Sequence, residues 1–362
     1  NFYPAFIDIY NYLEKNGSDS STMRNISEVF YSLFEVEMNV EYPILDAIYQ
    51  NILGDLFRTE HYKPFLQFIN KILDERRNNT PNYNIFLSKF YQTDFPINVV
   101  NLFHYFFNEK MDINSGEMVL CLRILLKLIK FDPNESSEDQ SFIQSHGIIN
   151  EKFDSLFLKE MKYLIFWDDL SFPPSIQKKC ELMSSEDREE ITMQAIHFFT
   201  MLIQQLGENG VTQVSNCHIL TGFLDHIDEF PYKLKSLFIV LCITALANTN
   251  SEQFIALVKC ENAEESCLYS LLTNIDPLNH KQLRALDQMI YHSGEILDSG
   301  TLYEIFIPYY DFLSSFQDEL DQNDPHNENL ASNLSMLLGQ LDREPDNVPR
   351  NDEGYLSDDD FD

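Results

Sequence analysis

The residue with the clearest chemical signal in this chain is a serine near its C-terminal end. The run Leu356-Ser357-Asp358-Asp359-Asp360 places Ser357 in the S-x-x-D pattern that acidophilic kinases modify. No helical pattern follows Ser357, so we expect its hydroxyl to be accessible. Phosphorylation there would add about −1.5 to −2 charges to a segment that is already negative. Ser357 is therefore the candidate phosphorylation site.

The same spacing recurs at 136–139 and at 184–187, and at the second of these a structural interpretation competes. Ser184 stands just before a segment in which Ile191, Ala195 and Phe198 recur at helical spacing. A serine followed three residues later by an acidic residue, at the start of a helix, is typical of a capping box. We predict that Ser184 caps a helix.

Histidines, cysteines and carboxylates show no metal-ligand spacing. Cys217 and His218 are adjacent in a segment that we expect to be helical, which directs them to different faces, whereas structural zinc needs four converging ligands. Cys260 and Cys267 fit buried thiols better than a ligand pair. The acidic run 318–324 lacks the central glycine and the terminal glutamate of a calcium-binding EF-hand. We predict no metal and no cofactor.

Catalytic motifs are equally absent from the sequence. No phosphate-binding G-x-x-x-x-G-K-[ST] or G-x-G-x-x-G loop occurs, and neither does H-E-x-x-H or G-x-S-x-G. An enzyme would have to assemble its site from distant residues such as His104, His197 or Asp168. The pair Asp168-Asp169 is typical of a solvated helix end, so no catalytic residue is assigned.

The net charge of the chain indicates which kinds of molecule it can bind. The chain has 58 acidic and 25 basic residues, a net charge of −33. Such a chain repels nucleic acids, whose binding depends on lysine and arginine contacts to phosphate, and it is repelled by anionic membranes. A basic protein is the partner that its field would attract, although acidity can also serve solubility alone. The longest stretch without an acidic residue, lysine, arginine or histidine, 236–251, is shorter than the roughly 20 residues of a membrane-spanning helix.

The distribution of the cysteines indicates the cellular compartment of the protein. The chain has 6 cysteines, dispersed and mostly inside apolar stretches such as 120–129 and 237–246. That distribution is typical of free buried thiols in a reducing environment. We therefore expect an intracellular protein, cytoplasmic or nuclear, and leave its oligomeric state open.

Helical periodicity dominates the elements that must carry these residues. No sustained alternation of the strand type occurs, and apolar residues recur every three or four positions. Prolines stand at or near the first turn of several such segments, where the missing N–H is tolerated. The clearest apolar stripe is Ile191, Ala195, Phe198, Leu202 and Leu206, and the prolines include Pro64, Pro96, Pro231 and Pro277. An all-α fold follows.

A loose internal recurrence underlies the helices. A long apolar helix is followed by a polar break, a short segment that often opens with Phe-Ile, and another amphipathic segment. The long helices of the copies are expected at 65–73, 117–131, 235–247 and 281–296. Their spacing is irregular.

These residues resemble the armadillo/HEAT-type α-solenoid superfamily. The resemblance rests on Ser236–Ala247, Phe254–Val258, Leu268–Leu272 and Leu283–Leu286, and it extends over about 25–315. It implies stacked units of about 40–47 residues, each burying its neighbour's apolar face. The turn glycine of armadillo units is mostly missing. The tryptophan ladder of nuclear-import adaptors cannot form around a single Trp167, so no subfamily is assigned.

Composition predicts three segments. Residues 1–316 form the helical-repeat domain, and 317–341 form an acidic linker with an amphipathic helix. Residues 342–362 form a disordered acidic tail of net charge −7, with nine acidic and two basic residues. The helix in the second segment is indicated by a leucine stripe at Leu330, Leu334, Leu337, Leu338 and Leu341.

The function expected from these features is non-catalytic. We predict a protein-interaction scaffold or adaptor that presents an acidic helical-repeat surface to a basic partner, with the tail tuning that binding electrostatically. An alternative is a regulatory or targeting subunit of a larger enzyme complex, which predicts a large apolar patch on one helix face. A more distant alternative is an enzyme whose site the sequence does not reveal.

Overall fold

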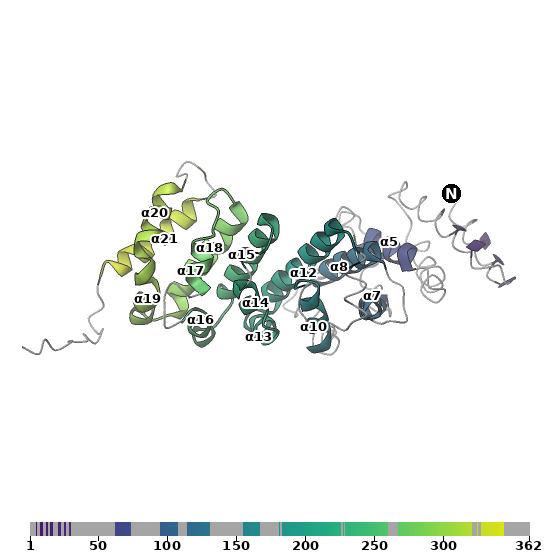
Figure 1. The fold of residues 1–362 in the computed structure, drawn as a ribbon, viewed down its shortest axis with the longest axis horizontal. Coiled ribbons are helices and arrows are strands. Elements are labelled where there is room, and N and C mark those ends of the chain that lie inside the picture. The colour runs from purple at the N-terminus through teal and green to yellow at the C-terminus, as the bar shows by residue number, and fades with distance from the viewer. Residues whose placement is uncertain are drawn as a thin grey trace, which may run out of the picture. The chain divides into compact units, whose positions relative to one another are not determined.

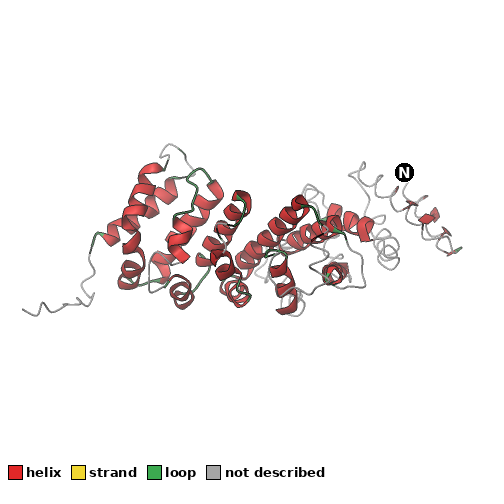
Figure 2. Cartoon of the chain, viewed as in Figure 1, coloured by secondary structure: helices red, strands yellow, loops and turns green. Residues whose placement is uncertain are grey.

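The computed structural model consists of helices joined by turns and loops in the part of the chain that it describes (Figure 1). It describes residues 62–73, 95–107, 114–130, 155–166, 183–225, 229–259, 267–320 and 327–343, with 181, 227, 324 and isolated positions or pairs between 5 and 29. None of these residues lies in a strand (Figure 2), which confirms the all-α prediction. The chain divides into two compact units, residues 1–221 and 222–362.

The first unit is organised around helix α8. The helices are α5 (Tyr62–Ile72), α7 (Phe95–Phe106), α8 (Ser115–Lys130), α10 (Ser155–Tyr163), α12 (Ser185–Leu206) and α13 (Glu208–Asn216), and α14 (Ile219–Asp225) begins at the end of the unit. Helix α8 packs against α5, α7 and α12. Leu122 and Leu125 on α8 are completely buried. Burial of a leucine side chain stabilises a fold by about 1.5–3 kcal/mol, so α8 is the core helix of this unit.

Aromatic rings join the shorter helices to that core. Phe157 of α10 lies between Phe103 of α7 and Phe198 of α12, with ring centroids 4.6 and 5.5 Å away. All three side chains are fully buried. The Oγ1 of Thr192 in α12 also donates a hydrogen bond to the carbonyl of Leu164, just beyond α10. These contacts fix α7, α10 and α12 against one another.

Helix α12 begins at the predicted cap and ends at a glycine. The Oγ of Ser184 accepts a hydrogen bond from the N–H of Asp187, as a helix-capping serine does. The Asp187 carboxylate also accepts a hydrogen bond from Ser115 of α8. Asp187 therefore takes part in the cap through its N–H and links α12 to α8 through its side chain. Gly207 has a φ of 54°, a conformation that favours glycine, and its N–H bonds back to the carbonyl of Ile203.

The second unit continues with helices α15 to α21. They are α15 (Tyr232–Leu246), α16 (Ser251–Val258), α17 (Cys267–Leu272), α18 (His280–Ile296), α19 (Ser299–Phe306), the 3₁₀ turn η5 (Ile307–Tyr309), α20 (Tyr310–Glu319) and α21 (Glu328–Leu341). Pro231 and Pro277 stand directly before or near the starts of α15 and α18, as predicted. Asn250 forms a full capping box with Gln253 at the start of α16.

Helices α15 and α18 lie side by side and run parallel (Figure 1). At their N-terminal ends, Nδ2 of Asn279 donates a 2.8 Å hydrogen bond to Oγ of Ser236. At their C-terminal ends, Nε2 of His292 lies 2.7 Å from the carbonyl oxygen of Thr249. Like ends therefore meet, and the paired residues are 43 positions apart in both contacts.

Helix α21 packs on the other side of α18. The Nδ2 of Asn333 donates a 2.8 Å hydrogen bond to Oδ1 of Asp287, 46 positions earlier. Helix α20 forms an antiparallel hairpin with α21, closed by a bond from the Tyr310 hydroxyl to Asp342 and another from Gln317 to the carbonyl of Ala331. The predicted leucine stripe is confirmed, because all five of its side chains are buried: Leu330, Leu334, Leu337, Leu338 and Leu341.

Candidate interaction surfaces

A histidine and a glutamate are in close contact between two helices of the first unit. Nδ1 of His104, on α7, lies 2.6 Å from Oε2 of Glu160 on α10. The two side chains are 28% and 11% exposed. The rings of Phe103 and Phe157 flank the imidazole, with centroids 6.0 and 5.8 Å away.

This pair joins two helices inside an aromatic cluster. A carboxylate that accepts from one imidazole nitrogen fixes the ring's orientation, which serves both structural pairs and general bases. The rings of two phenylalanines lie close to this imidazole, at the contact between α7 and α10. Among the other residues considered for a distant catalytic set, His197 lies half-buried on α12, and Asp168 lies outside the described residues. The geometry therefore supports a structural pair.

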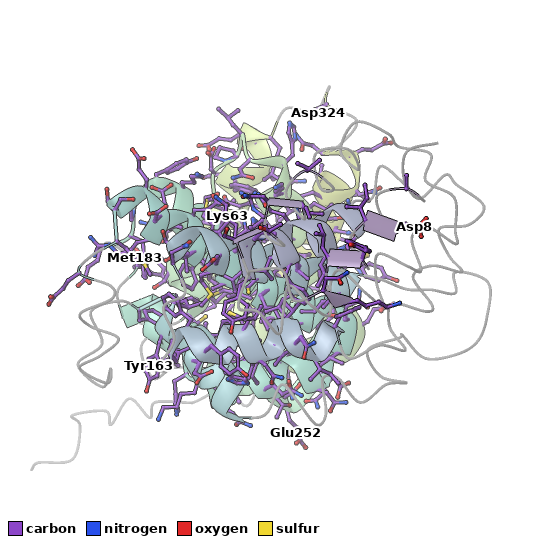
Figure 3. The ribbon with its side chains drawn as sticks, turned by 90° about the vertical axis from the view of Figure 1, so that its right-hand side faces the viewer. Asp8, Lys63, Tyr163, Met183, Glu252 and Asp324 are labelled. Atoms are coloured by element: carbon purple, nitrogen blue, oxygen red, sulfur yellow. The ribbon has the colours of Figure 1, made fainter. Side chains whose placement is uncertain are left out.

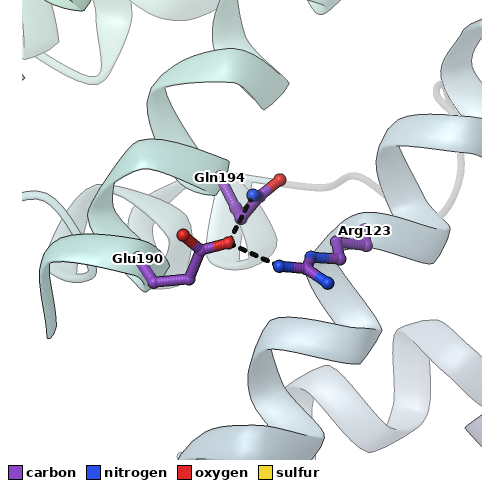
Figure 4. A network of polar contacts seen from close by, with 3 residues as sticks. All are labelled: Arg123, Glu190 and Gln194. Atoms are coloured by element: carbon purple, nitrogen blue, oxygen red, sulfur yellow. Dashed lines mark hydrogen bonds and ion pairs between the residues drawn. The ribbon is translucent and has the colours of Figure 1, made fainter. Parts of the chain in front are cut away.

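A second polar network links α8 to α12 at the surface (Figure 4). One carboxylate oxygen of Glu190 accepts hydrogen bonds from Nη2 of Arg123, at 2.8 Å, and from Nε2 of Gln194, at 2.9 Å. The Arg123 side chain is 49% exposed, so water and salt screen the ion pair. Its role is to orient helices that the core already holds together.

The described cysteines are free thiols with suppressed reactivity. Burial raises the pKa of the Cys121 and Cys242 thiols far above the usual value and raises that of Cys267 to about 12. The pKa of Cys217, which ends α13, is also raised by burial, and the charge of Lys162 opposes the shift. Because thiolates are the reactive and metal-binding form, these are poor nucleophiles and poor ligands.

His218 differs from the sequence expectation in its backbone. It follows Cys217 in the turn between α13 and α14 and has a φ of 55°, so the two residues are not on one helix. No group of three or more histidine, cysteine, aspartate or glutamate side chains that could hold a metal occurs in the part of the chain that the structure describes.

Exposed carboxylates gather on the last helices of the second unit. From residue 285 to 343, the only lysine or arginine that the structure describes is Arg343. Over the same range eight carboxylates are exposed, from the end of α18 to the residue after α21: Glu295, Asp298, Glu304, Asp311, Asp318, Glu319, Glu328 and Asp342. We call this set the acidic C-terminal helices.

Basic residues gather elsewhere in the same unit. Lys233 and Lys235 lie in the first turns of α15, and Lys281 and Arg284 lie in the first turns of the neighbouring α18. We call these four residues the basic corner. The remaining lysine and arginine in the described part of this unit are Lys259 and Arg343. The second unit therefore carries surfaces of opposite charge.

An apolar pair lies beside the basic corner. The side chains of Tyr232 and Leu278 are 68% and 84% exposed. Both residues are held by Asp276, whose carboxylate accepts hydrogen bonds from the Tyr232 hydroxyl and from the N–H of Leu278. These two bonds lower the pKa of Asp276, and the first raises the pKa of Tyr232.

Some sequence expectations fall on residues that the structure does not describe. Ser357 lies outside the described residues, as does the acidic tail beyond Arg343, so its phosphorylation stays a prediction. The predicted boundaries at residues 316 and 341 also stay predictions. Of the helices that the structure describes, none combines the length and the apolar character needed to cross a bilayer.

No family model, curated protein or solved structure matches this chain. The features that bear on its function are therefore those of its own surfaces. The two that stand out, the acidic C-terminal helices and the basic corner, both belong to the second unit. Of the two, the carboxylates are the more numerous, and they carry the charge sign of the chain as a whole.

Proposed function

We propose that the chain is a non-catalytic protein-interaction scaffold of the armadillo/HEAT type, whose acidic C-terminal helices bind a basic protein. The observation that carries the proposal is the accumulation of exposed carboxylates from Glu295 to Asp342, in a range where Arg343 is the only described lysine or arginine. A surface of one charge sign attracts partners of the opposite sign and accelerates their encounter.

Stacking of like helices supports the repeat architecture. Helix α18 lies against both α15 and α21, and the side-chain hydrogen bonds that join these helices connect residues 43 and 46 positions apart. That separation matches armadillo and HEAT units of about 40–47 residues. Repeats of this kind present extended surfaces for partner proteins, since each unit contacts only its neighbours.

Four of these carboxylates, on α19 and α20, are available to form ion pairs with a partner. Glu304, Asp311, Asp318 and Glu319 are exposed on α19 and α20, and none is joined to a lysine or arginine of the described residues. A basic partner would therefore gain ion pairs without breaking any that these four already make. Mutual repulsion among the carboxylates would be relieved at the same time.

The proposal can be tested with two variants of equal net charge. The first neutralises the proposed surface with Glu304→Gln, Asp311→Asn, Asp318→Asn and Glu319→Gln. The matched control neutralises four exposed carboxylates elsewhere: Asp8, Glu181, Glu186 and Glu252, the last of which points outward in Figure 3. Wild type, both variants and a chain ending at Leu341 are immobilised, and bound proteins are identified at low and at physiological salt.

A discrete basic protein should remain on the wild type and on the control at physiological salt and leave the first variant. Equal loss from both variants would mean that only total charge attracts the partner. Retention of no specific protein by any form would contradict the scaffold function itself. The chain ending at Leu341 shows whether the tail with Ser357 contributes to binding.

A further inference from the structure

The basic corner is an exception in a strongly acidic chain. Of the lysines and arginines in the described part of the second unit, four lie at the adjoining N-terminal ends of α15 and α18, and only Lys259 and Arg343 lie elsewhere. The two helix ends are held together by hydrogen bonds from Asn279 and Gln282 to Ser236. The fold thus brings the pair Lys233 and Lys235 to the helix end that adjoins the pair Lys281 and Arg284.

The position of these charges is electrostatically unfavourable. The N-terminal end of a helix carries a partial positive charge, which favours acidic side chains there and disfavours basic ones. Helices α16, α20 and α21 follow this rule, with Glu252, Asp311 and Glu328 in their first turns. Neither α15 nor α18 has an acidic residue in its first turn. An anionic group placed at the corner would offset this repulsion.

The neighbouring acidic groups leave part of the corner unneutralised. Asp276 is already engaged by the Tyr232 hydroxyl and the Leu278 N–H, and Asp324 lies 3.8 Å from Nδ1 of His280. Lys233 and Lys235 have interactions of their own within the chain. Lys281 and Arg284 are exposed, and neither forms an ion pair with another described residue. These two cations are available to a partner.

The exposed apolar pair supplies the second part of the surface. Tyr232 and Leu278 are bound to the two oxygens of one carboxylate, so the ring and the leucine backbone are held beside each other. Leu278 precedes Lys281 by three residues. Large apolar side chains with such exposure gain stability when a partner covers them. A surface with cations around apolar side chains is complementary to an acidic segment that also carries apolar residues.

We propose that the basic corner, with Tyr232 and Leu278, is a second docking surface, which binds a short acidic segment of another protein. Carboxylates of that segment pair with Lys281 and Arg284, and one of its large apolar side chains covers Tyr232 and Leu278. This surface is separate from the acidic C-terminal helices and takes a partner of opposite charge. A nucleic acid is the less favoured occupant, because its long phosphate chain would meet the net charge of −33 beyond the corner.

The test measures fluorescence anisotropy of a labelled peptide on titration with the full chain at physiological salt. The probe is a fluorescein-labelled peptide in which two leucines are flanked by aspartates. Control peptides replace the aspartates with asparagine or the leucines with serine, and a labelled single-stranded oligonucleotide tests the phosphate alternative. The variants are Lys281→Glu with Arg284→Glu, and a matched control of Lys259→Glu with Arg343→Glu, which makes the same charge change in the same unit.

The corner variant should bind the acidic peptide at least about tenfold more weakly than wild type, because two ion pairs become repulsions. The matched control should bind within about twofold of wild type. Leu278→Ser, at a side chain already exposed, should weaken binding several-fold and leave the circular dichroism melt unchanged. Equal weakening in both double variants, no binding of the acidic peptide, or tighter binding of the oligonucleotide than of the peptide would overturn the proposal. None of these outcomes depends on whether the acidic C-terminal helices bind a basic protein.

Discussion

Nδ1 of His104 and Oε2 of Glu160 lie 2.6 Å apart, and this contact joins α7 to α10 across 56 positions of sequence. Glu160 is almost completely buried, and a buried carboxylate needs a partner because its desolvation is otherwise uncompensated. The imidazole provides that partner at the edge of the aromatic cluster around Phe157. The pair therefore adds a polar link between α7 and α10 to the aromatic contacts that already hold α10 in the first unit.

Breaking this pair from the histidine side should destabilise the first unit. We expect His104→Ala to lower its free energy of unfolding by about 2–4 kcal/mol, because the Glu160 carboxylate would remain buried without this partner. The double variant His104→Leu with Glu160→Leu should recover much of the loss, since no polar group is then left unpaired. Urea denaturation of the three forms checks this. Equal losses in the single and double variants would show that the unpaired Glu160 carboxylate is not the cause of the destabilisation.

Gly210 should not tolerate a side chain. A Cβ at this position would lie 2.8 Å from the Cα of Ile203 and 2.8 Å from the carbonyl oxygen of Leu202, and both are backbone atoms that cannot rotate away. We expect Gly210→Ala to destabilise the α12–α13 turn by about 1–3 kcal/mol.

The control for Gly210 is Gly294, which lies inside α18 with nothing within 4 Å of its Cβ position. Gly294→Ala should stabilise the second unit by about 0.5–1 kcal/mol, since alanine favours the helix. Thermal unfolding of both variants provides the measurement. A Gly210→Ala variant as stable as wild type would contradict the close approach of α13 to α12.

Gln282 is the buried polar residue that joins the starts of α15 and α18. Only 1% of it is exposed, its Oε1 accepts a 2.7 Å hydrogen bond from the N–H of Asp276, and its Nε2 donates to Oγ of Ser236. Gln282→Met should destabilise the second unit by about 1–3 kcal/mol by leaving these groups unpaired. Gln288→Met, at an exposed site of the same helix, should have little effect. Hydrogen exchange of the backbone amides of α15 and α18 distinguishes the two variants. Equal protection of these amides in both variants would contradict the role of Gln282.

Stability of the second unit should fall in alkaline solution because of a buried thiol. Burial raises the pKa of Cys242 well above its ordinary value of 9.0. Above about pH 9 the unfolded chain releases this proton while the folded chain keeps it, so the free energy of unfolding falls by up to about 1.4 kcal/mol per pH unit. Below that pH both states are protonated and the thiol adds no pH dependence. Urea titrations from neutral to alkaline pH should show the free energy of unfolding falling less steeply with pH for Cys242→Ala than for wild type. Identical pH dependence of the two proteins would contradict this.

The long helices could be predicted because their signals are local. The segments 65–73, 117–131, 235–247 and 281–296 fold largely as α5, α8, α15 and α18, since apolar periodicity and nearby prolines act within a few residues. The cap at Ser184 was recognisable for the same reason. The hydrogen bond from Ser115 to the carboxylate of Asp187, the partner of Ser184 in that cap, could not be predicted, because Ser115 and Asp187 are 72 positions apart in the chain.

The candidate surfaces could not be predicted in the same way. Lys233 and Lys281 are each the second residue of their helix, so a 48-residue repeat of lysine was present in the sequence. The sequence contains no local signal that the two helices lie parallel with their N-terminal ends together. That arrangement depends on contacts of Ser236 with Asn279 and Gln282 across the interface. The His104–Glu160 pair has no local signal at all.

The most direct test of the central claim is the affinity of the captured basic protein for the two charge-matched variants, measured by calorimetry at physiological salt. We predict that neutralising Glu304, Asp311, Asp318 and Glu319 weakens binding at least about tenfold, while neutralising Asp8, Glu181, Glu186 and Glu252 changes it by less than about twofold. Equal affinities for both variants would contradict recognition by the acidic C-terminal helices.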